Sequence, residues 1–129
     1  MIYVDTSVAL AHLLAEDRVP SARLWQETIV SSRLLVYETW GRIHARDLGD
    51  SHADAVHELI ARISFLELRT EVLARALEPF PVPVRTLDAL HLASVEFLRS
   101  TGQEIELASY DQRQLGAARQ LGIPICSWV

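Results

Sequence analysis

Short apolar runs alternate along the chain with longer stretches in which apolar residues recur at helical spacing. The apolar runs have the length and composition of buried strands, and we expect strands at residues 1–4, 34–36, 65–68, 105–108 and 124–128. The intervening stretches predict helices at 7–14, 21–29, 38–48, 53–63, 71–77, 87–99 and 112–121. Strands separated by helices favour a mainly parallel sheet with helices on both faces, so the expected fold class is α/β.

Length and composition indicate one folded domain that spans residues 1–129. Half of the 129 residues are hydrophobic and 22% are charged, which is typical of a globular protein and not of a disordered one. No apolar stretch is long enough to cross a membrane, and the first residues lack the basic start of a signal peptide. The single cysteine, Cys126, cannot form an internal disulfide, so we expect a cytoplasmic protein.

The net charge of −5 has the wrong sign for a protein that holds nucleic acid by a general basic surface. Two explanations follow. Either nucleic acid is not the partner, or much of the negative charge lies in a site that cations occupy when the protein works. If four carboxylates belong to such a site, the remaining surface is close to neutral.

Three carboxylates follow predicted strands and begin predicted helices: Asp5, Glu38 and Asp111. Each could act only as a helix N-cap or as a favourable charge at a helix N-terminus. In a parallel sheet, however, the carboxyl ends of the strands meet at one edge, which is where ligands bind in open α/β folds. We therefore expect the three side chains to lie together.

A fourth carboxylate, Asp88, lies in a helix that is apolar on nearly every face and is therefore expected to be central in the fold. A buried carboxylate needs a cation, a network of hydrogen-bond donors or a metal, because burying it unpaired is costly. Arg85 or His91 could supply a purely structural partner. His91 lies three residues after Asp88, on the same helix face, and is assigned a supporting hydrogen bond, not metal binding.

Four carboxylates within a few ångströms of one another repel and raise each other's pKa values unless a cation is present. Oxygen-rich sites of this kind suit Mg²⁺ or Mn²⁺, which also bind phosphate oxygens. A bound ion can activate a water for attack on a phosphodiester bond. The pattern thus predicts a metal-dependent hydrolase of phosphodiesters, with Asp5, Glu38, Asp88 and Asp111 as its metal-binding, catalytic residues.

The chain resembles the PIN-domain nucleases, and especially the VapC toxins of bacterial and archaeal toxin–antitoxin pairs. The resemblance covers nearly the whole chain and rests on MIYVDTS at 1–7, Glu38, LDALHLA at 87–93 and SYD at 109–111. It implies an α/β/α sandwich, an endoribonuclease activity, the four acids as metal ligands, and Thr6 and Ser109 as residues that hold these acids or a bound water. It also implies a homodimer and a cognate antitoxin protein. Ser109 stands where the family often has Thr, which keeps the hydroxyl.

Two alternatives remain open: a metal-dependent DNA or structure-specific nuclease with the same acids, and a catalytically inactive protein-interaction module. Single-stranded RNA is favoured by the resemblance and by the lack of an obvious basic helix that could follow a duplex. The candidate contacts to RNA phosphates are four arginines near the proposed edge: Arg42, Arg46, Arg85 and Arg113.

Other enzyme classes fit poorly. A haloacid-dehalogenase type phosphatase needs a second Asp where Ser7 stands, and the chain has no lysine for its cationic partner. The five histidines and one cysteine show no paired spacing for zinc. The chain also lacks the G-x-S-x-G motif of a serine hydrolase.

Overall fold

The computed structural model describes residues 1–129 and contains a four-stranded sheet. The strands are β1 (Ile2–Val4), β2 (Ile29–Ser32), β3 (Ile63–Leu66) and β4 (Glu106–Ala108). Their order is β3-β2-β1-β4, and every neighbouring pair is parallel. The parallel sheet expected from the sequence is therefore confirmed.

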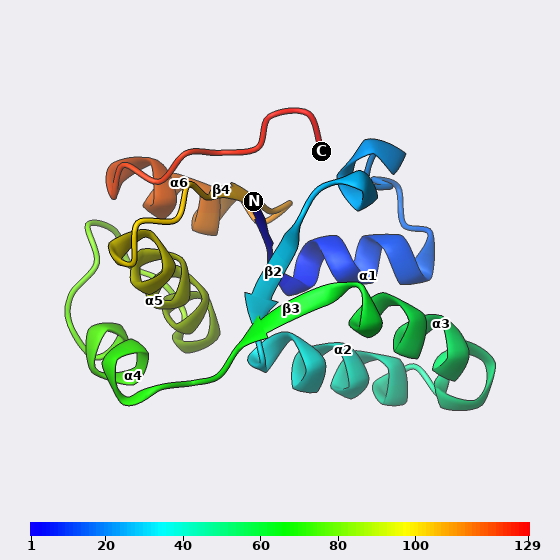
Figure 1. The fold of residues 1–129 in the computed structure, drawn as a ribbon. Coiled ribbons are helices and arrows are strands. Elements are labelled where there is room, and N and C mark those ends of the chain that lie inside the picture. The colour runs from blue at the N-terminus through cyan, green and yellow to red at the C-terminus, as the bar shows by residue number, and fades with distance from the viewer.

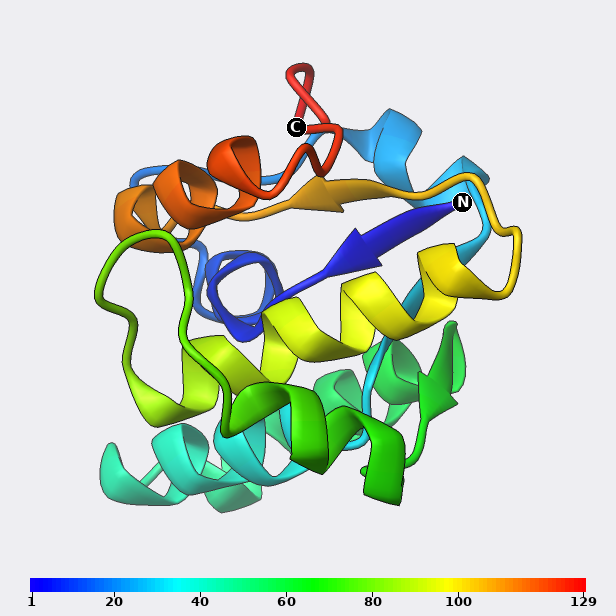
Figure 2. The same cartoon turned by 90° about the vertical axis from the view of Figure 1, so that its left-hand side faces the viewer.

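Helices cover both faces of the sheet (Figure 1). On one face lie α1 (Thr6–Leu14), α2 (Leu34–Ala45) and α3 (Gly49–Ala61), and on the other lie α5 (Thr86–Ser100) and α6 (Gln112–Gln120). The short helix α4 (Thr70–Ala76) packs on the outer side of α5 (Figure 2). A 3-10 helix, η1 (Ala22–Gln26), precedes β2. The fold is an α/β/α sandwich, and none of its helices is both long and apolar enough to cross a bilayer.

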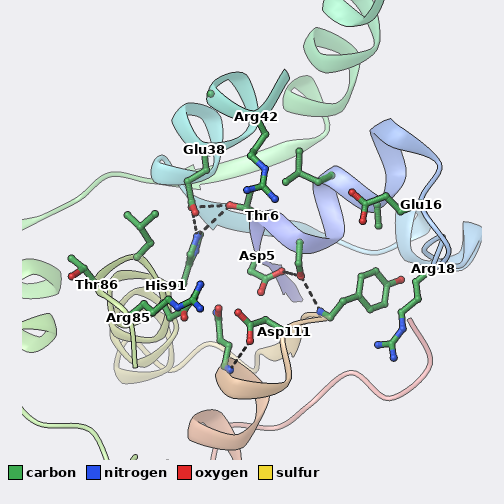
Figure 3. A pocket seen from close by; sticks show the side chains of 18 of the residues that line it. Asp5, Thr6, Glu16, Arg18, Glu38, Arg42, Arg85, Thr86, His91 and Asp111 are labelled. Carbon is green, nitrogen blue, oxygen red and sulfur yellow. Dashed lines mark hydrogen bonds and ion pairs between the residues drawn. The ribbon is translucent and has the colours of Figure 1, made fainter. Parts of the chain in front are cut away.

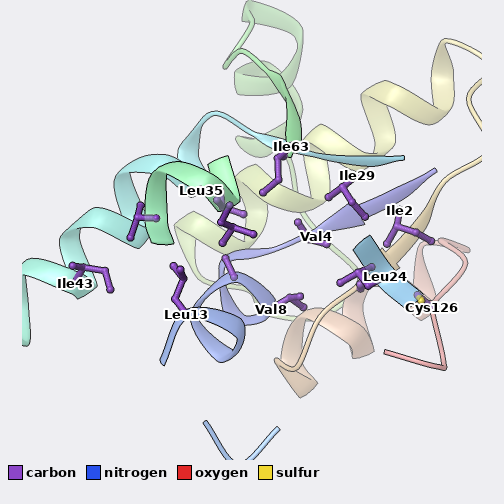
Figure 4. Close-up of a cluster of buried hydrophobic side chains, with 14 residues drawn as sticks. Ile2, Val4, Val8, Leu13, Leu24, Ile29, Leu35, Ile43, Ile63 and Cys126 are labelled. Atoms are coloured by element: carbon purple, nitrogen blue, oxygen red, sulfur yellow. The ribbon is translucent and has the colours of Figure 1, made fainter. Parts of the chain in front are cut away.

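The alternation of side chains along β1 divides the interior into two cores. Ile2 and Val4 face one core together with residues of α1, α2 and α3 (Figure 4). Tyr3 faces the other core together with residues of α5 and α6. All three residues are at least 96% buried, and β1 is one of the two inner strands of the sheet, so the core holds in place the residue that follows it.

The second strand lies elsewhere than the sequence analysis expected. The apolar run at 34–36 is the first turn of α2, and the strand is the preceding segment, Ile29–Ser32. Short apolar runs do not distinguish a strand from a buried helix. Here the helical period decides, because Leu35, Thr39 and Ile43 recur every fourth residue and are fully buried.

Two other expected elements are smaller than predicted. The helix expected at 21–29 is only the five-residue η1, because the chain must extend again to form β2. The strand expected at 124–128 is a single bridge between Leu107 and Ile125. The N–H of Leu107 donates to the carbonyl of Pro124, and the N–H of Cys126 donates to the carbonyl of Leu107. Pro124 has no N–H, so it cannot donate a further bond that would extend the strand.

The strand order reverses at β1. The chain passes from β1 to β2 and β3 in one direction and then returns to place β4 on the opposite side of β1. In open α/β folds a crevice forms at such a reversal, beyond the carboxyl ends of the strands. Asp5 follows β1 and Asp111 lies shortly after β4, so the topology brings these two acids to the same crevice.

Candidate active site

All four predicted acids line one pocket at the carboxyl edge of the sheet, with a volume of about 1020 Å³ (Figure 3). They come from four different elements: Asp5 from the end of β1, Glu38 from α2, Asp88 from α5, and Asp111 from the start of α6. The sequence separation between the first and last of them shows that only the folded chain assembles this pocket.

Asp5 is the most rigidly held of the four. Its side chain is only 3% exposed, and both carboxylate oxygens accept hydrogen bonds. Oδ1 accepts from Ser7 Oγ at 2.5 Å and from the backbone N–H of Val8 at 3.3 Å, which caps α1, while Oδ2 accepts from Ser109 Oγ. Burial raises the pKa of Asp5, and the bonds from the two serines act in the opposite direction. A positive charge nearby would favour the ionised form.

Asp88 is half-buried, whereas the sequence analysis expected a buried carboxylate in a central helix. It is the third residue of α5, so it lies in the first turn, and it faces the pocket. Burial is the main cause that raises the pKa of Asp88, and the charges of Asp111 and Asp5 raise it further. Neither Arg85 nor His91 forms an ion pair with Asp88, although both act to lower its pKa.

A buried glutamine joins two of the acids. Gln114 is 1% exposed, and its side-chain nitrogen, in the amide orientation that suits its neighbours, donates to Asp5 Oδ2 at 3.3 Å and to Asp88 Oδ1 at 3.2 Å. Because both carboxylates reach the same nitrogen, they lie close together. The sequence analysis missed Gln114; its only signal is its place three residues after Asp111, on the same face of α6.

Asp111 combines a structural role with a place in the pocket. Its Oδ1 accepts from the backbone N–H groups of Arg113 at 2.9 Å and Gln114 at 3.3 Å, so it is the N-cap of α6. Its second oxygen accepts no hydrogen bond from the protein. The capping interpretation and the functional one are therefore compatible, because each uses a different oxygen.

Glu38 is held by a chain of buried hydrogen bonds. Thr6 Oγ1 donates to Glu38 Oε1 at 2.8 Å, and His91 Nε2 lies 2.7 Å from the same oxygen. On the other side of the imidazole, His91 Nδ1 lies 2.7 Å from the hydroxyl of Tyr3. The supporting residues expected from the sequence, Thr6 and His91, thus contact an acid, and Tyr3 is a member that the sequence did not reveal.

The donor set of the pocket suits a hard divalent cation. It consists of carboxylates without a thiolate, and both nitrogens of its one histidine, His91, are already engaged. One oxygen each of Glu38, Asp88 and Asp111 accepts no hydrogen bond from the protein, which leaves these atoms available to a ligand. In the observed side-chain conformations, no three acidic, histidine or cysteine side chains lie close enough together to bind one metal ion. Mg²⁺ does not require three protein ligands, because it is commonly held by one or two carboxylates together with waters and substrate phosphates.

Three arginines line the same pocket: Arg18, Arg42 and Arg85. None of them forms an ion pair with a carboxylate, so their charges are free to face a substrate. Arg42 and Arg85 were expected from the sequence, and Arg18 was not. Arg46 and Arg113, the other two candidates, are not among the residues that line the pocket.

Comparison with known proteins gives three consistent matches. A family model described as PIN domain matches residues 2–120. Ribonuclease VapC46 of Mycobacterium tuberculosis (strain ATCC 25618 / H37Rv) is 31% identical over 128 residues, which cover 96% of this chain and 95% of that protein. Ribonuclease VapC47 of Mycobacterium tuberculosis (strain CDC 1551 / Oshkosh) is 28% identical over 134 residues, which cover 98% of this chain and 96% of that protein.

One solved structure has the same fold. The crystal structure of Mycobacterium tuberculosis VapC20, a sarcin-ricin loop cleaving toxin, superposes with a TM-score of 0.65. The alignment covers 91% of this chain and 95% of that one, at 21% sequence identity. At this identity the likeness supports the architecture of the sheet and its helices.

Proposed function

The chain belongs to the PIN-domain family, and from this membership and its four-acid pocket we propose that it is a divalent-metal-dependent endoribonuclease. Its substrate is RNA, and its reaction is hydrolysis of a phosphodiester bond. It acts as the toxin of a toxin–antitoxin pair, as the resemblance to the VapC ribonucleases implies. Mg²⁺ or Mn²⁺ is the proposed ion, and Asp5, Glu38, Asp88 and Asp111 are the residues that hold it.

The observation that carries this proposal is the meeting of all four acids in one pocket. A protein-interaction module would have no reason to keep four carboxylates together, because they repel one another without a cation. Burial is the main cause of the raised pKa of Asp88, and the charges of Asp111 and Asp5 raise it further, which is a sign of this repulsion. The inactive alternative therefore has no support from a specific contact.

The side chains divide the work of the reaction. A divalent cation held by the four acids would supply a water of lowered pKa and a positive charge for the phosphate. Ser7, Ser109 and Gln114 fix Asp5 beside Asp88, which keeps the two carboxylates oriented before a ligand arrives. Arg42 and Arg85, at the rim of the same pocket, are placed to neutralise the phosphate of the substrate.

The chemistry of the product ends tests this proposal. Water, and not the ribose 2′-hydroxyl, attacks the phosphorus, and the P–O3′ bond breaks with O3′ as the leaving group, so each cut should leave a 5′-phosphate and a 3′-hydroxyl. Matched single-stranded RNA, single-stranded DNA and duplex RNA should be incubated with the protein in Mg²⁺, and the ends of any product should be identified. A 2′,3′-cyclic phosphate would contradict the mechanism, and cutting of the DNA alone would support the DNA-nuclease alternative.

The partners and the location follow from the same proposal. We expect a homodimer, a cognate antitoxin that covers the acidic pocket, and a cytoplasmic setting in which the buried thiol of Cys126 stays reduced. These three points stay predictions.

A further inference from the structure

A second groove adjoins the acidic pocket on the side of the C-terminal segment. It has a volume of about 750 Å³, and α6 and the C-terminal residues form much of its lining. Asp17, Arg18 and Tyr110 line both hollows, so these three side chains form the boundary between them. We call the second hollow the tail groove. Nothing in the proposed reaction uses it.

The tail groove differs from the acidic pocket in its charge. Two arginines, Arg18 and Arg119, line the groove with a single acidic side chain, Asp17, whereas acidic side chains outnumber arginines in the acidic pocket. Neither arginine forms an ion pair with a carboxylate. On a chain with a net charge of −5, two unpaired cations beside the acidic pocket are a local feature that favours an anionic ligand.

The boundary also carries an aromatic ring that is fixed to the acidic pocket. The backbone N–H of Tyr110 donates to Ser7 Oγ at 2.9 Å, and the same Ser7 hydroxyl donates to Asp5. The ring is half-buried and packs against the core that contains Ile2 and Val4, while the guanidinium carbon of Arg18 lies 5.7 Å from its centroid. The distance between the ring and the catalytic acids is therefore set by hydrogen bonds and packing, not by a mobile loop.

We propose that the tail groove binds the nucleotides that adjoin the scissile phosphate on one side of a single-stranded RNA. The strand passes from the acidic pocket over Tyr110 and Arg18, where one base stacks, and continues along the groove, where Arg119 contacts a phosphate. Proteins that hold single strands combine such cations with an aromatic platform, because every base has a π-face. This inference rests on the proposed ribonuclease activity and adds a subsite to it.

The matched control for the charge is on the same helix. Arg119 and Arg113 are both exposed residues of α6, but Arg113 lines neither the acidic pocket nor the tail groove. Binding of a fluorescently labelled single-stranded RNA is measured in the Asp88→Asn background with Mg²⁺ present, so that cleavage does not interfere. Arg119→Gln and Arg18→Gln should each weaken binding. Arg119→Gln should also make the slope of log K against log salt shallower by about 0.7, the value for one phosphate contact to a single strand. Arg113→Gln should leave both unchanged.

The contribution of the ring is tested by two substitutions of Tyr110. Tyr110→Phe keeps the aromatic face and should bind RNA as tightly as the parent. Tyr110→Leu keeps much of the packing but removes the face, and should weaken binding about 5- to 100-fold. Thermal melts of each variant show whether the fold is intact, and the arginine variants test the groove independently, because substitutions of exposed side chains usually change stability little.

The result that overturns the subsite is distinguishable from failure of the proposed function. If the wild type neither binds nor cleaves RNA, the ribonuclease proposal fails, and the subsite fails with it. If the wild type cleaves RNA but Arg119→Gln and Arg18→Gln bind like Arg113→Gln, only the subsite is wrong. The subsite is also wrong if these variants keep full RNA binding but lose binding to a co-purified partner protein, because the groove would then hold a peptide.

Discussion

The imidazole of His91 lies directly behind Glu38, with Nε2 2.7 Å from Glu38 Oε1. The proton on this nitrogen can be placed by following the bonds of Tyr3. Its hydroxyl accepts from the backbone N–H of Ser32 at 3.2 Å, which leaves its own proton available to His91 Nδ1 at 2.7 Å. Burial raises the pKa of Tyr3 well above its usual range, so the hydroxyl keeps this proton. From these bonds we assign the proton of His91 to Nε2, where it is directed at Glu38 Oε1.

Tyr3→Phe should disturb this chain without changing the shape of the core. It removes the hydroxyl and leaves the N–H of Ser32 and the Nδ1 of His91 without their partner, at a cost of about 1–3 kcal/mol in the free energy of unfolding. It also frees His91 to change tautomer, so kcat/KM should fall about 10-fold or more. Urea denaturation and cleavage kinetics measure the two effects.

The matched control for this substitution is Tyr37→Phe. Tyr37 is 72% exposed, so loss of its hydroxyl should change neither stability nor rate by a measurable amount. If Tyr3→Phe behaves like Tyr37→Phe in both measurements, the hydrogen-bond chain does not position Glu38.

The Asp88→Asn variant tests whether Asp88 binds the metal ion or stabilises the fold. In EDTA the variant should be as stable as the wild type or more so, because the substitution removes one charge from a group of acids that repel one another. The Asn oxygen can still accept from Gln114. In excess Mg²⁺ the order should reverse, since the wild type gains about 2.7 kcal/mol at a metal concentration of 100 Kd and the variant gains less.

Thermal melts of both proteins in EDTA and in Mg²⁺ measure this reversal. Asp54→Asn, an exposed change on α3 away from the pocket, should melt like the wild type in both conditions. A large loss of stability in Asp88→Asn that does not depend on metal would mean that Asp88 serves the fold and not the ion.

The raised pKa values of Asp5 and Asp88 give the metal-free protein a defined pH dependence. A carboxyl whose pKa is raised in the folded state binds its proton more tightly there than in the unfolded chain. Its contribution to stability is therefore complete below the ordinary value of about 4 and is lost as the pH rises through the raised value. In EDTA the wild type should lose stability relative to Asp88→Asn as the pH rises from about 4, because the variant lacks one of the two groups.

Urea unfolding of the two proteins at a series of pH values checks this difference. A gap in stability that stays constant with pH would contradict the raised pKa of Asp88. A gap that changes in the opposite direction would mean that the fold stabilises the ionised form of this side chain.

Exposed leucines on α4 are the best candidates for the interface of the predicted homodimer. Leu77, which ends α4, is 88% exposed, and Leu73 on the same helix is 43% exposed. Leu77→Glu should convert a dimer to a monomer in light scattering, whereas Leu77→Met, which keeps an apolar side chain, should not. A wild type that remains a strict monomer at high concentration would contradict the dimer itself.

The part of the site that could be predicted is the part that topology determines. Asp5 and Asp111 follow β1 and β4, and the rule that parallel strands end at one edge is enough to place them together. Glu38 reaches the pocket for a different reason from the one expected. Glu38 was chosen as a residue that follows a strand and begins a helix, and that reason is wrong, because the apolar run before it is the first turn of α2 and Glu38 belongs to the second turn. Only the family resemblance pointed to Glu38 independently of its position after a strand.

Residues that act through buried hydrogen bonds could not be predicted from the sequence. Gln114 and Tyr3 look like an ordinary helix residue and an ordinary strand residue, and their roles appear only when α6 and β1 are packed against α5. Arg18 was missed for the same reason, because it follows α1 in a loop and reaches the pocket only in the folded chain. Local sequence patterns predict helices and strands, whereas contacts between elements that are distant in the sequence depend on how the core is assembled.

The most direct test is the initial rate of single-stranded RNA cleavage by the wild type, Asp88→Asn and Asp54→Asn, each in Mg²⁺ and in EDTA. We expect the wild type and Asp54→Asn to cleave in Mg²⁺ and to be inactive in EDTA, and Asp88→Asn to stay at the EDTA background in both. Cleavage by the wild type that persists in EDTA, or an Asp88→Asn variant that cleaves at the wild-type rate in Mg²⁺, would contradict metal-dependent hydrolysis by the four-acid pocket.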